Sequence, residues 1–143
     1  METLKSLLKK HAQKLRFGLV GIANTALDFV ILFILVGLGL DKIPANYIST
    51  AIAFLFSFAV NKSFTFKSTG GNVKKQFALF IGVTAVGLWV IQPIVIAVVA
   101  WILGPTDWSS PVILFVAKII ATVASLIWNY LFYSRLVFKK AEK

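Results

Sequence analysis

The sequence contains no cysteine and a single histidine, His11, which lies in a basic N-terminal stretch. The lack of cysteine excludes a disulfide framework, a thiolate nucleophile and a cysteine-ligated metal site. Only five acidic residues are present, and no two of them have the spacing of an acid–base pair. The glycine-rich fingerprints of P-loop and dinucleotide-binding proteins are also missing. These absences argue against an ATP-driven pump or a membrane hydrolase, so we expect neither an enzyme nor a bound cofactor or metal.

Long apolar runs are what the chain has instead. Hydrophobic residues make up 59% of its 143 positions, whereas soluble domains have about 45–50%. Four apolar stretches cover about 17–38, 45–63, 77–103 and 111–132, and each meets the requirement of about 17–25 residues for crossing a bilayer. We therefore predict an all-α integral membrane protein. Four transmembrane helices form one domain over residues 17–138, with short segments at 1–16 and 139–143.

The basic residues are distributed unevenly between the two predicted sides of the membrane. Thirteen of the 15 lysines and arginines precede the first span, follow the fourth, or lie between the second and third. The other two connections contain only Lys42. The positive-inside rule then places both termini and the middle loop in the cytoplasm. The net charge of +10 is explained by this topology and by contact with anionic headgroups, so no nucleic-acid partner is predicted.

Residues 1–16 have leucines at helical spacing with lysines between them, a pattern typical of a short interfacial helix on the inner leaflet. A frayed basic tail is the alternative. The segment at 139–143 is a short basic tail.

A weak internal repeat relates the two halves of the chain. Ser57 and Asn61 end the second span with the spacing that Ser125 and Asn129 show in the fourth. This pattern predicts two hairpins of the same orientation, a parallel repeat about an axis along the membrane normal. A chance similarity between two hydrophobic hairpins is the alternative.

Polar residues interrupt the predicted spans. Asn24 and Asp28 lie four residues apart on one face of the first span, and Lys118 and Asn129 share a stripe on the fourth. A charge at membrane depth costs at least about 2.5–3.5 kcal/mol, so it usually has a partner or a function. One interpretation is an Asp28–Lys118 ion pair that fixes helix register. The other is a polar track for a charged or hydroxylated substrate.

Other polar residues support these faces. Asn61 lies on a polar stripe of the second span, where a bond to a neighbouring helix is expected. Thr122 and Ser125 are expected to bond their own helix backbone. Pro93 follows Gln92 inside the third span and predicts a kink, because it has no amide hydrogen to donate to the Trp89 carbonyl. The kink is either a packing feature or a functional break.

At the predicted cytoplasmic ends, Lys62, Arg135 and Arg16 occupy positions where a phosphate would lie. Contact with lipid headgroups is the alternative. Aromatic residues predict an outer belt at Trp101 and Trp108, and an inner belt at Phe64, Phe66, Tyr130 and Tyr133.

Three segments resemble the GtrA-like family of small four-span membrane proteins. They are Phe17–Thr25, Asn61–Phe66 and the last-span pattern of Lys118, Ser125, Asn129 and Arg135. Two departures exist: Lys62 stands where the family usually has arginine, and Phe64 where it usually has tryptophan. The first departure puts bidentate phosphate binding by residue 62 in question.

The resemblance implies a flippase of the cytoplasmic (inner) membrane that moves a polyprenyl-phosphate-linked monosaccharide outward for glycosylation of surface polysaccharides. Glycosyltransferases of that pathway are the implied protein partners, and a homo-oligomer is expected because four helices enclose little volume. Together with the polar faces and basic ends described above, this gives the candidate substrate-binding residues Asn24, Asp28, Asn61, Lys62, Lys118, Asn129 and Arg135. Two alternatives stay open: a small proton-coupled multidrug exporter, and a non-transporting membrane subunit of a glycosyltransferase.

Overall fold

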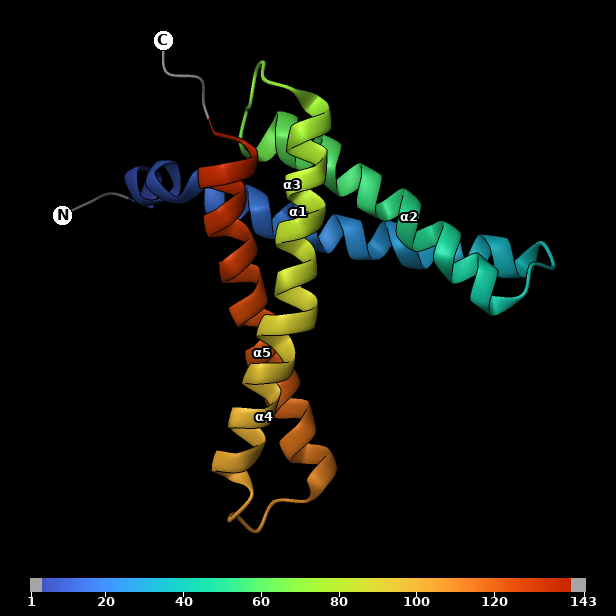
Figure 1. Cartoon of the computed structure of the whole chain (residues 1–143), viewed down its shortest axis with the longest axis vertical. Coiled ribbons are helices and arrows are strands. Elements are labelled where there is room, and N and C mark those ends of the chain that lie inside the picture. The colour runs from blue at the N-terminus through green and yellow to red at the C-terminus, as the bar shows by residue number, and fades with distance from the viewer. Residues whose placement is uncertain (1–3, 140–143) are drawn as a thin grey trace. The chain divides into compact units, whose positions relative to one another are not determined.

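The structure, a computed structural model, describes the backbone of residues 4–139 and the side chains of residues 11–139. Every regular element in this part of the chain is helical (Figure 1). Four helical segments are long and apolar enough to cross a membrane: His11–Gly37, Lys42–Thr65, Val73–Leu103 and Ser110–Val137. The predicted four-span, all-α architecture is therefore confirmed. These apolar sequences are expected to form helices, because lipid offers no partner for backbone N–H and C=O groups and a helix pairs them internally.

The chain divides into two compact units. The first unit runs to Gly70, and the second covers Gly71–Lys139. Each unit contains two of the four spans. The parallel repeat, the cytoplasmic location of the termini and the interfacial role of residues 1–16 stay predictions.

The first unit pairs α1 (Leu4–Gly37) with α2 (Lys42–Val60), which lie side by side in Figure 1. α1 continues through residue 16 without a break, so the predicted interfacial segment is not a separate helix from Leu4 onward. Gly39, with φ of 93°, ends α1. The Leu40 N–H donates to the Leu35 carbonyl and the Gly39 N–H to the Val36 carbonyl, which is a Schellman cap.

Small residues form the tightly packed face of α2. Ala45, Ser49 and Ala53 recur every four residues and are fully buried. Because such residues let helix backbones approach closely, this stripe accounts for the packing of α2 against α1. α2 then changes into a π-helical turn, η1 (Asn61–Thr65), which extends the second span beyond the predicted end at 63.

The second unit contains α3 (Val73–Val86), the π-helical turn η2 (Gly87–Ile91), α4 (Gln92–Leu103), α5 (Ser110–Phe132) and a last π-helical turn, η3 (Tyr133–Val137). Asn72 caps α3 by accepting a hydrogen bond from the Lys75 N–H. α5 packs against α4 and η2, and it buries a small-residue stripe of Ala117, Ala121 and Ser125.

The π-helical turn η2 lies directly before the predicted break at Gln92–Pro93. The Gln92 N–H donates to the Gly87 carbonyl, five residues back. A π-helical turn is a common response to a disturbed α-helical ladder, and Pro93 disturbs it because its ring displaces the bond to the Trp89 carbonyl. The third span is therefore a helix with a local change of winding at this point.

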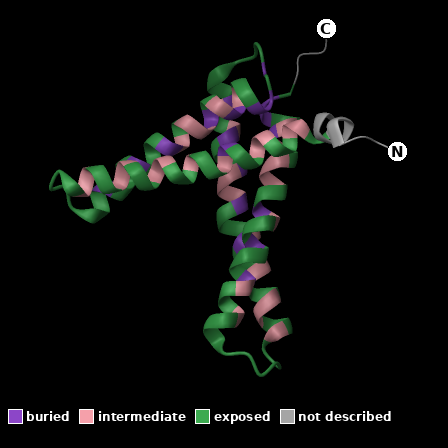
Figure 2. Cartoon of the chain, turned by 180° about the vertical axis from the view of Figure 1, so that it is seen from behind, coloured by how far each residue is buried: buried purple, intermediate pink, exposed green. Residues whose placement is uncertain are grey.

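Exposed residues cover most of both helix pairs (Figure 2). No more than 22% of the most apolar window of any span is buried within the chain. Large residues such as Phe33, Trp89 and Trp101 are exposed. Soluble monomers rarely expose apolar patches of this extent, whereas lipid solvates them. The chain is a multi-pass membrane protein.

Candidate functional site

Asp28 lies within α1 and has a hydrogen-bond partner on α2. The Thr50 hydroxyl donates to the Asp28 carboxylate at 3.4 Å, a long bond. Asp28 is half-buried. The contact brings together one polar residue from each helix of the first unit, Asp28 of α1 and Thr50 of α2. A carboxylate with one long hydrogen bond keeps most of its capacity to accept further donors.

Asn24, one helical turn before Asp28, is half-buried on the same face of α1. Its side-chain oxygen is buried and has no hydrogen-bond partner among the described residues. Buried amide oxygens are normally satisfied, so an unsatisfied one calls for an explanation. Nearby Thr25 donates to the Gly21 carbonyl of its own helix instead.

The π-helical turn η1 holds two more buried oxygens without a partner in the described part of the chain, one on Asn61 and one on Thr65. The Asn61 amide nitrogen donates to the Ser57 hydroxyl at 3.2 Å. The amide nitrogen of Asn61 was expected to bond a neighbouring helix. That prediction is wrong, because the nitrogen donates to a residue of its own span. The π-helical winding, which nothing in the local sequence indicates, sets the direction of both side chains.

Basic residues gather where η1 meets α1. The Lys62 ammonium donates to the Gly70 carbonyl at 3.2 Å, and the Ser68 N–H donates to the Lys62 carbonyl. These two bonds fold the loop after η1 back onto Lys62, with Lys67 in the left-handed region at φ of 48°. The Arg16 guanidinium lies 5.5 Å from the centre of the Phe64 ring, a cation–π contact. Arg16 and Lys62 thus belong to the same end of the first unit.

In the second unit, Lys118 of α5 donates to the side-chain oxygen of Gln92 at 2.6 Å. Gln92 is buried and is the first residue of α4, whereas Lys118 is exposed. In the sequence, Gln92 was noted only as the residue before Pro93 at the predicted kink. Its contact with Lys118 was not predicted. The Thr122 hydroxyl donates to the Lys118 carbonyl, which confirms the predicted bond to its own helix backbone.

Ser125 and Asn129 face η2. A Cβ atom added at Gly87 would lie 2.9 Å from the Ser125 hydroxyl oxygen and 2.9 Å from the Asn129 side-chain oxygen. That Asn129 oxygen is another buried atom with no hydrogen-bond partner in the described residues. Beside them, the Trp128 indole N–H donates to the Val83 carbonyl. The absence of a side chain at residue 87 is what lets these polar groups approach the π-helical turn.

Tyr133 extends the polar stripe of α5 and was missed as a polar contact. Its hydroxyl lies 2.5 Å from the Thr84 hydroxyl, and its ring stacks on Phe80 at 4.6 Å between centres. Tyr133 and Phe66 are buried, so their predicted places in an inner aromatic belt are corrected. The sequence could have predicted that Tyr133 lies on the polar stripe, because it follows Asn129 by four residues.

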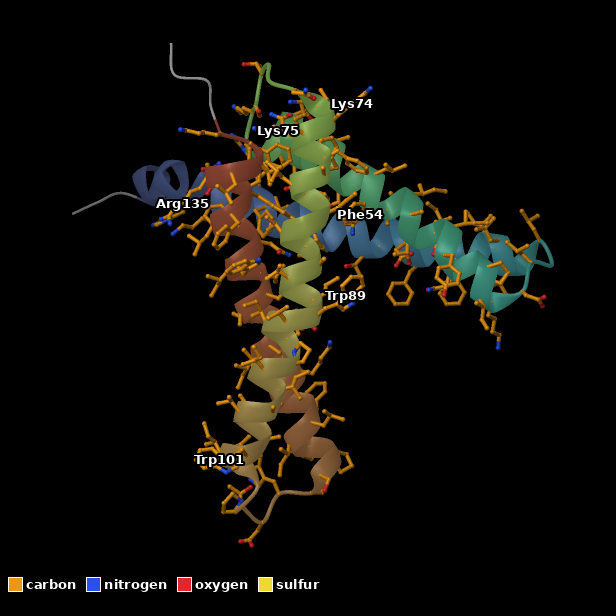
Figure 3. All side chains as sticks on the ribbon, in the orientation of Figure 1. Phe54, Lys74, Lys75, Trp89, Trp101 and Arg135 are labelled. Carbon is orange, nitrogen blue, oxygen red and sulfur yellow. The ribbon has the colours of Figure 1, made fainter. Side chains whose placement is uncertain are left out.

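Arg135 is exposed on η3. Figure 3 shows it toward the same end of the second unit as Lys74 and Lys75, with Trp101 at the opposite end. Phosphate capture by Arg135 together with Lys62 stays a prediction, because these residues belong to different units. The same holds for an Asp28–Lys118 pair. Each of those two side chains has a neutral partner of its own, Thr50 and Gln92 respectively.

Within the described residues, no group of three histidine, cysteine or acidic side chains could hold a metal ion. The sequence matches the family described as GtrA/DPMS, transmembrane domain, over residues 16–141. The chain belongs to this family. The match includes the four predicted spans and every candidate site residue, and it confirms the resemblance to GtrA-like proteins. No curated protein matches the sequence.

Proposed function

We propose that this GtrA/DPMS-family chain is a flippase that carries a polyprenyl-phosphate-linked monosaccharide from the inner to the outer leaflet of the cytoplasmic membrane. The proposal is that of a transporter and not of an enzyme. Its product would serve the glycosylation of a surface polysaccharide, with glycosyltransferases acting before and after it. Both termini and the middle loop would be cytoplasmic, as the distribution of basic residues indicates.

One observation carries this proposal. Each unit has a charged side chain that is hydrogen-bonded to a neutral side chain of the neighbouring helix, inside segments of membrane-spanning length: Asp28 with Thr50, and Lys118 with Gln92. A charged headgroup that crosses a bilayer needs polar contacts on the way, while its apolar tail does not. Neutral partners leave both charges able to interact with such a headgroup.

The partnerless buried oxygens support contact with a hydroxylated substrate. Asn24 and Asn129 each have a buried side-chain oxygen that lacks a donor in the described residues. Sugar hydroxyls are donors, so Asn24 and Asp28 of the first unit would bind sugar hydroxyls, as would Asn129 of the second. Asn61 has the same property in η1.

The basic ends of the units support capture of the phosphate. Arg16 and Lys62 belong to one end of the first unit, and Arg135 lies on the last π-helical turn of the second. Each of these cations would bind phosphate at the cytoplasmic end of its own unit, and Lys118 would attract the phosphate toward the outer leaflet. The Lys62–Gly70 bond is a weak competitor, because a phosphate oxygen is a stronger acceptor of an ammonium donor than a carbonyl.

Reconstitution tests the proposal. Purified protein in liposomes receives a polyprenyl-phosphate sugar labelled in its headgroup, and a membrane-impermeant reagent measures how fast the headgroup reaches the other leaflet. We expect faster translocation than in empty vesicles. Thr122→Val is the matched control, because that hydroxyl bonds only its own helix backbone in the described contacts. Translocation no faster than in empty vesicles rejects the proposal.

The exporter alternative predicts a different phenotype. A proton-coupled exporter of cationic drugs would protect cells in a growth assay, and Asp28→Asn would remove that protection. The flippase predicts no protection with either residue at position 28. Lys118 disfavours the exporter, because a cation within the membrane repels a cationic substrate.

A further inference from the structure

Lys118 is a membrane-embedded cation whose partner carries no charge. Its ammonium donates to the Gln92 oxygen at 2.6 Å, a short, charge-assisted bond. Lys118 is the ninth residue of α5, about 12 Å along the helix axis from its start at Ser110. Asp107 is the one acidic residue between Gly71 and Lys139, and it lies in the turn between α4 and α5. The second unit therefore supplies no carboxylate at the depth of Lys118.

A neutral partner orients a cation without cancelling its charge. An ammonium group has three N–H donors, and in the described residues Lys118 uses one of them on Gln92. The Thr122 hydroxyl donates to the backbone carbonyl of Lys118 and not to its side chain. Two donors and the full positive charge then remain for an acceptor from outside the helix pair, and Lys118 is exposed.

Gln92 is held in place by the change of helical winding in the third span. It is the first residue after η2, its N–H donates to the Gly87 carbonyl, and Pro93 follows it. Gln92 as a whole is only 8% exposed. A buried amide on a helix with this local winding has little freedom to move, so its oxygen fixes the direction of the Lys118 ammonium.

We propose that Lys118 and Gln92 form an anion-binding site for a phosphate group within the membrane-spanning part of the second unit. Lys118 contacts the phosphate oxygens, and Gln92 is a positioning residue that orients the ammonium and keeps it uncompensated. The inference rests on the proposed function for the origin of the phosphate, the headgroup of a lipid-linked sugar. It adds the role of Gln92, and it explains why the partner is an amide and not a carboxylate.

A purely structural tie between α4 and α5 is the competing explanation, and Gln92→Glu separates the two. If the bond only joins the helices, glutamate makes an ion pair with Lys118 that joins them at least as well. If the site binds an anion, the same ion pair neutralises the ammonium and removes the binding. Thermal stability should be kept in both cases, so anion binding decides between them: it is unchanged in the first case and lost in the second.

The test uses the full-length protein in lipid nanodiscs and dodecyl phosphate as the probe, with uncharged dodecanol as the blank. Affinity comes from the concentration dependence of the rise in thermal midpoint that binding causes. We expect Gln92→Glu to weaken dodecyl phosphate binding by at least about tenfold, equivalent to about 1.4 kcal/mol. The midpoint of the unliganded variant should stay equal to that of the native protein or rise above it.

Three further variants keep the test decisive if Gln92→Glu does not fold. Gln92→Leu leaves the charge but removes its orienting acceptor, so binding should weaken less than in Lys118→Gln. The exchange of both residues, Gln92→Lys with Lys118→Gln, returns a cation and an amide to the same pair of helices and should recover part of the binding. Thr122→Val should bind as the native protein does. Native-like binding by Gln92→Glu or Lys118→Gln overturns the proposal.

Competition with inorganic phosphate identifies the source of the anion. Displacement of dodecyl phosphate by millimolar inorganic phosphate supports a site that is open to free anions. Resistance to displacement supports a site reached from the lipid. Failure of the flippase proposal is recognised separately. If the native protein does not translocate lipid-linked sugar but the binding pattern holds, the anion site stands alone. If Gln92→Glu translocates and binds like the native protein, the site is wrong and the flippase stands.

Discussion

The Asn129 side-chain oxygen lies 2.9 Å from the point where a side chain on Gly87 would begin. This close approach joins the fourth span to the π-helical turn of the third, and Ser125 makes the same approach one turn earlier. Any residue with a Cβ at position 87 must push these polar groups away. The position of the Asn129 amide therefore depends on a glycine that lies 42 positions earlier in the sequence.

Gly87→Ala should destabilise the protein by about 1–3 kcal/mol through overpacking. Denaturant titration of the purified protein in detergent measures the change. Gly82→Ala is the matched control, because a Cβ at that exposed helical position meets nothing within 4 Å. Alanine there should be neutral or stabilise the helix by up to about 1 kcal/mol. Equal stability of the two variants would contradict the close packing at Gly87.

Tyr133→Phe should lower stability by about 0.5–1.5 kcal/mol, because it removes the hydrogen bond with Thr84 and keeps the stacking on Phe80. The Thr84 hydroxyl retains its bond to the Phe80 carbonyl, which limits the loss. The same unfolding experiment measures it. Tyr47→Phe serves as the control, since Tyr47 is 72% exposed. An unchanged midpoint for Tyr133→Phe alone would show that the Thr84 contact contributes nothing.

Asp28→Asn and Lys118→Met should each reduce glycosylation of the surface polysaccharide by at least about tenfold if the protein transports the lipid-linked sugar. The physical reason is that each variant removes a charge which the headgroup meets inside the membrane. Glycosylation is measured in cells where immunoblotting shows normal accumulation of the variant, with Thr122→Val beside it. Full glycosylation in both charge variants would favour the non-transporting subunit instead.

Single cysteines test the topology directly, because the native chain has none. Ser109→Cys lies in the turn between α4 and α5, and Thr69→Cys lies in the loop after η1; both positions are exposed. An impermeant maleimide should label Ser109→Cys in intact cells and Thr69→Cys only after the membrane is opened. The reverse pattern would invert the predicted orientation and would exchange the inner and outer roles of Lys62 and Lys118.

The positions of two helix ends could not be predicted accurately from the sequence. The second and fourth spans were predicted to end at 63 and 132, but π-helical turns carry the helices on to Thr65 and Val137. Hydropathy does not predict these turns, because a π-helical turn depends on which backbone carbonyl accepts the hydrogen bond from each N–H. Tyr133 was assigned to the membrane interface for the same reason, since the winding of η3 and the contact with Phe80 turn it inward.

Hydropathy along the chain was enough to determine the four membrane-spanning helices, because solvation by lipid depends on the length and apolarity of each segment alone. The sequence also located the unusual polar residues Asp28 and Lys118 on those helices. Only the tertiary structure decided their partners, Thr50 and Gln92, which lie 22 and 26 residues away. Such pairings depend on the rotation and depth of one helix against another. Those are set by where small residues, such as the buried alanines of α2 and α5, let the backbones approach, and not by any property of a single segment.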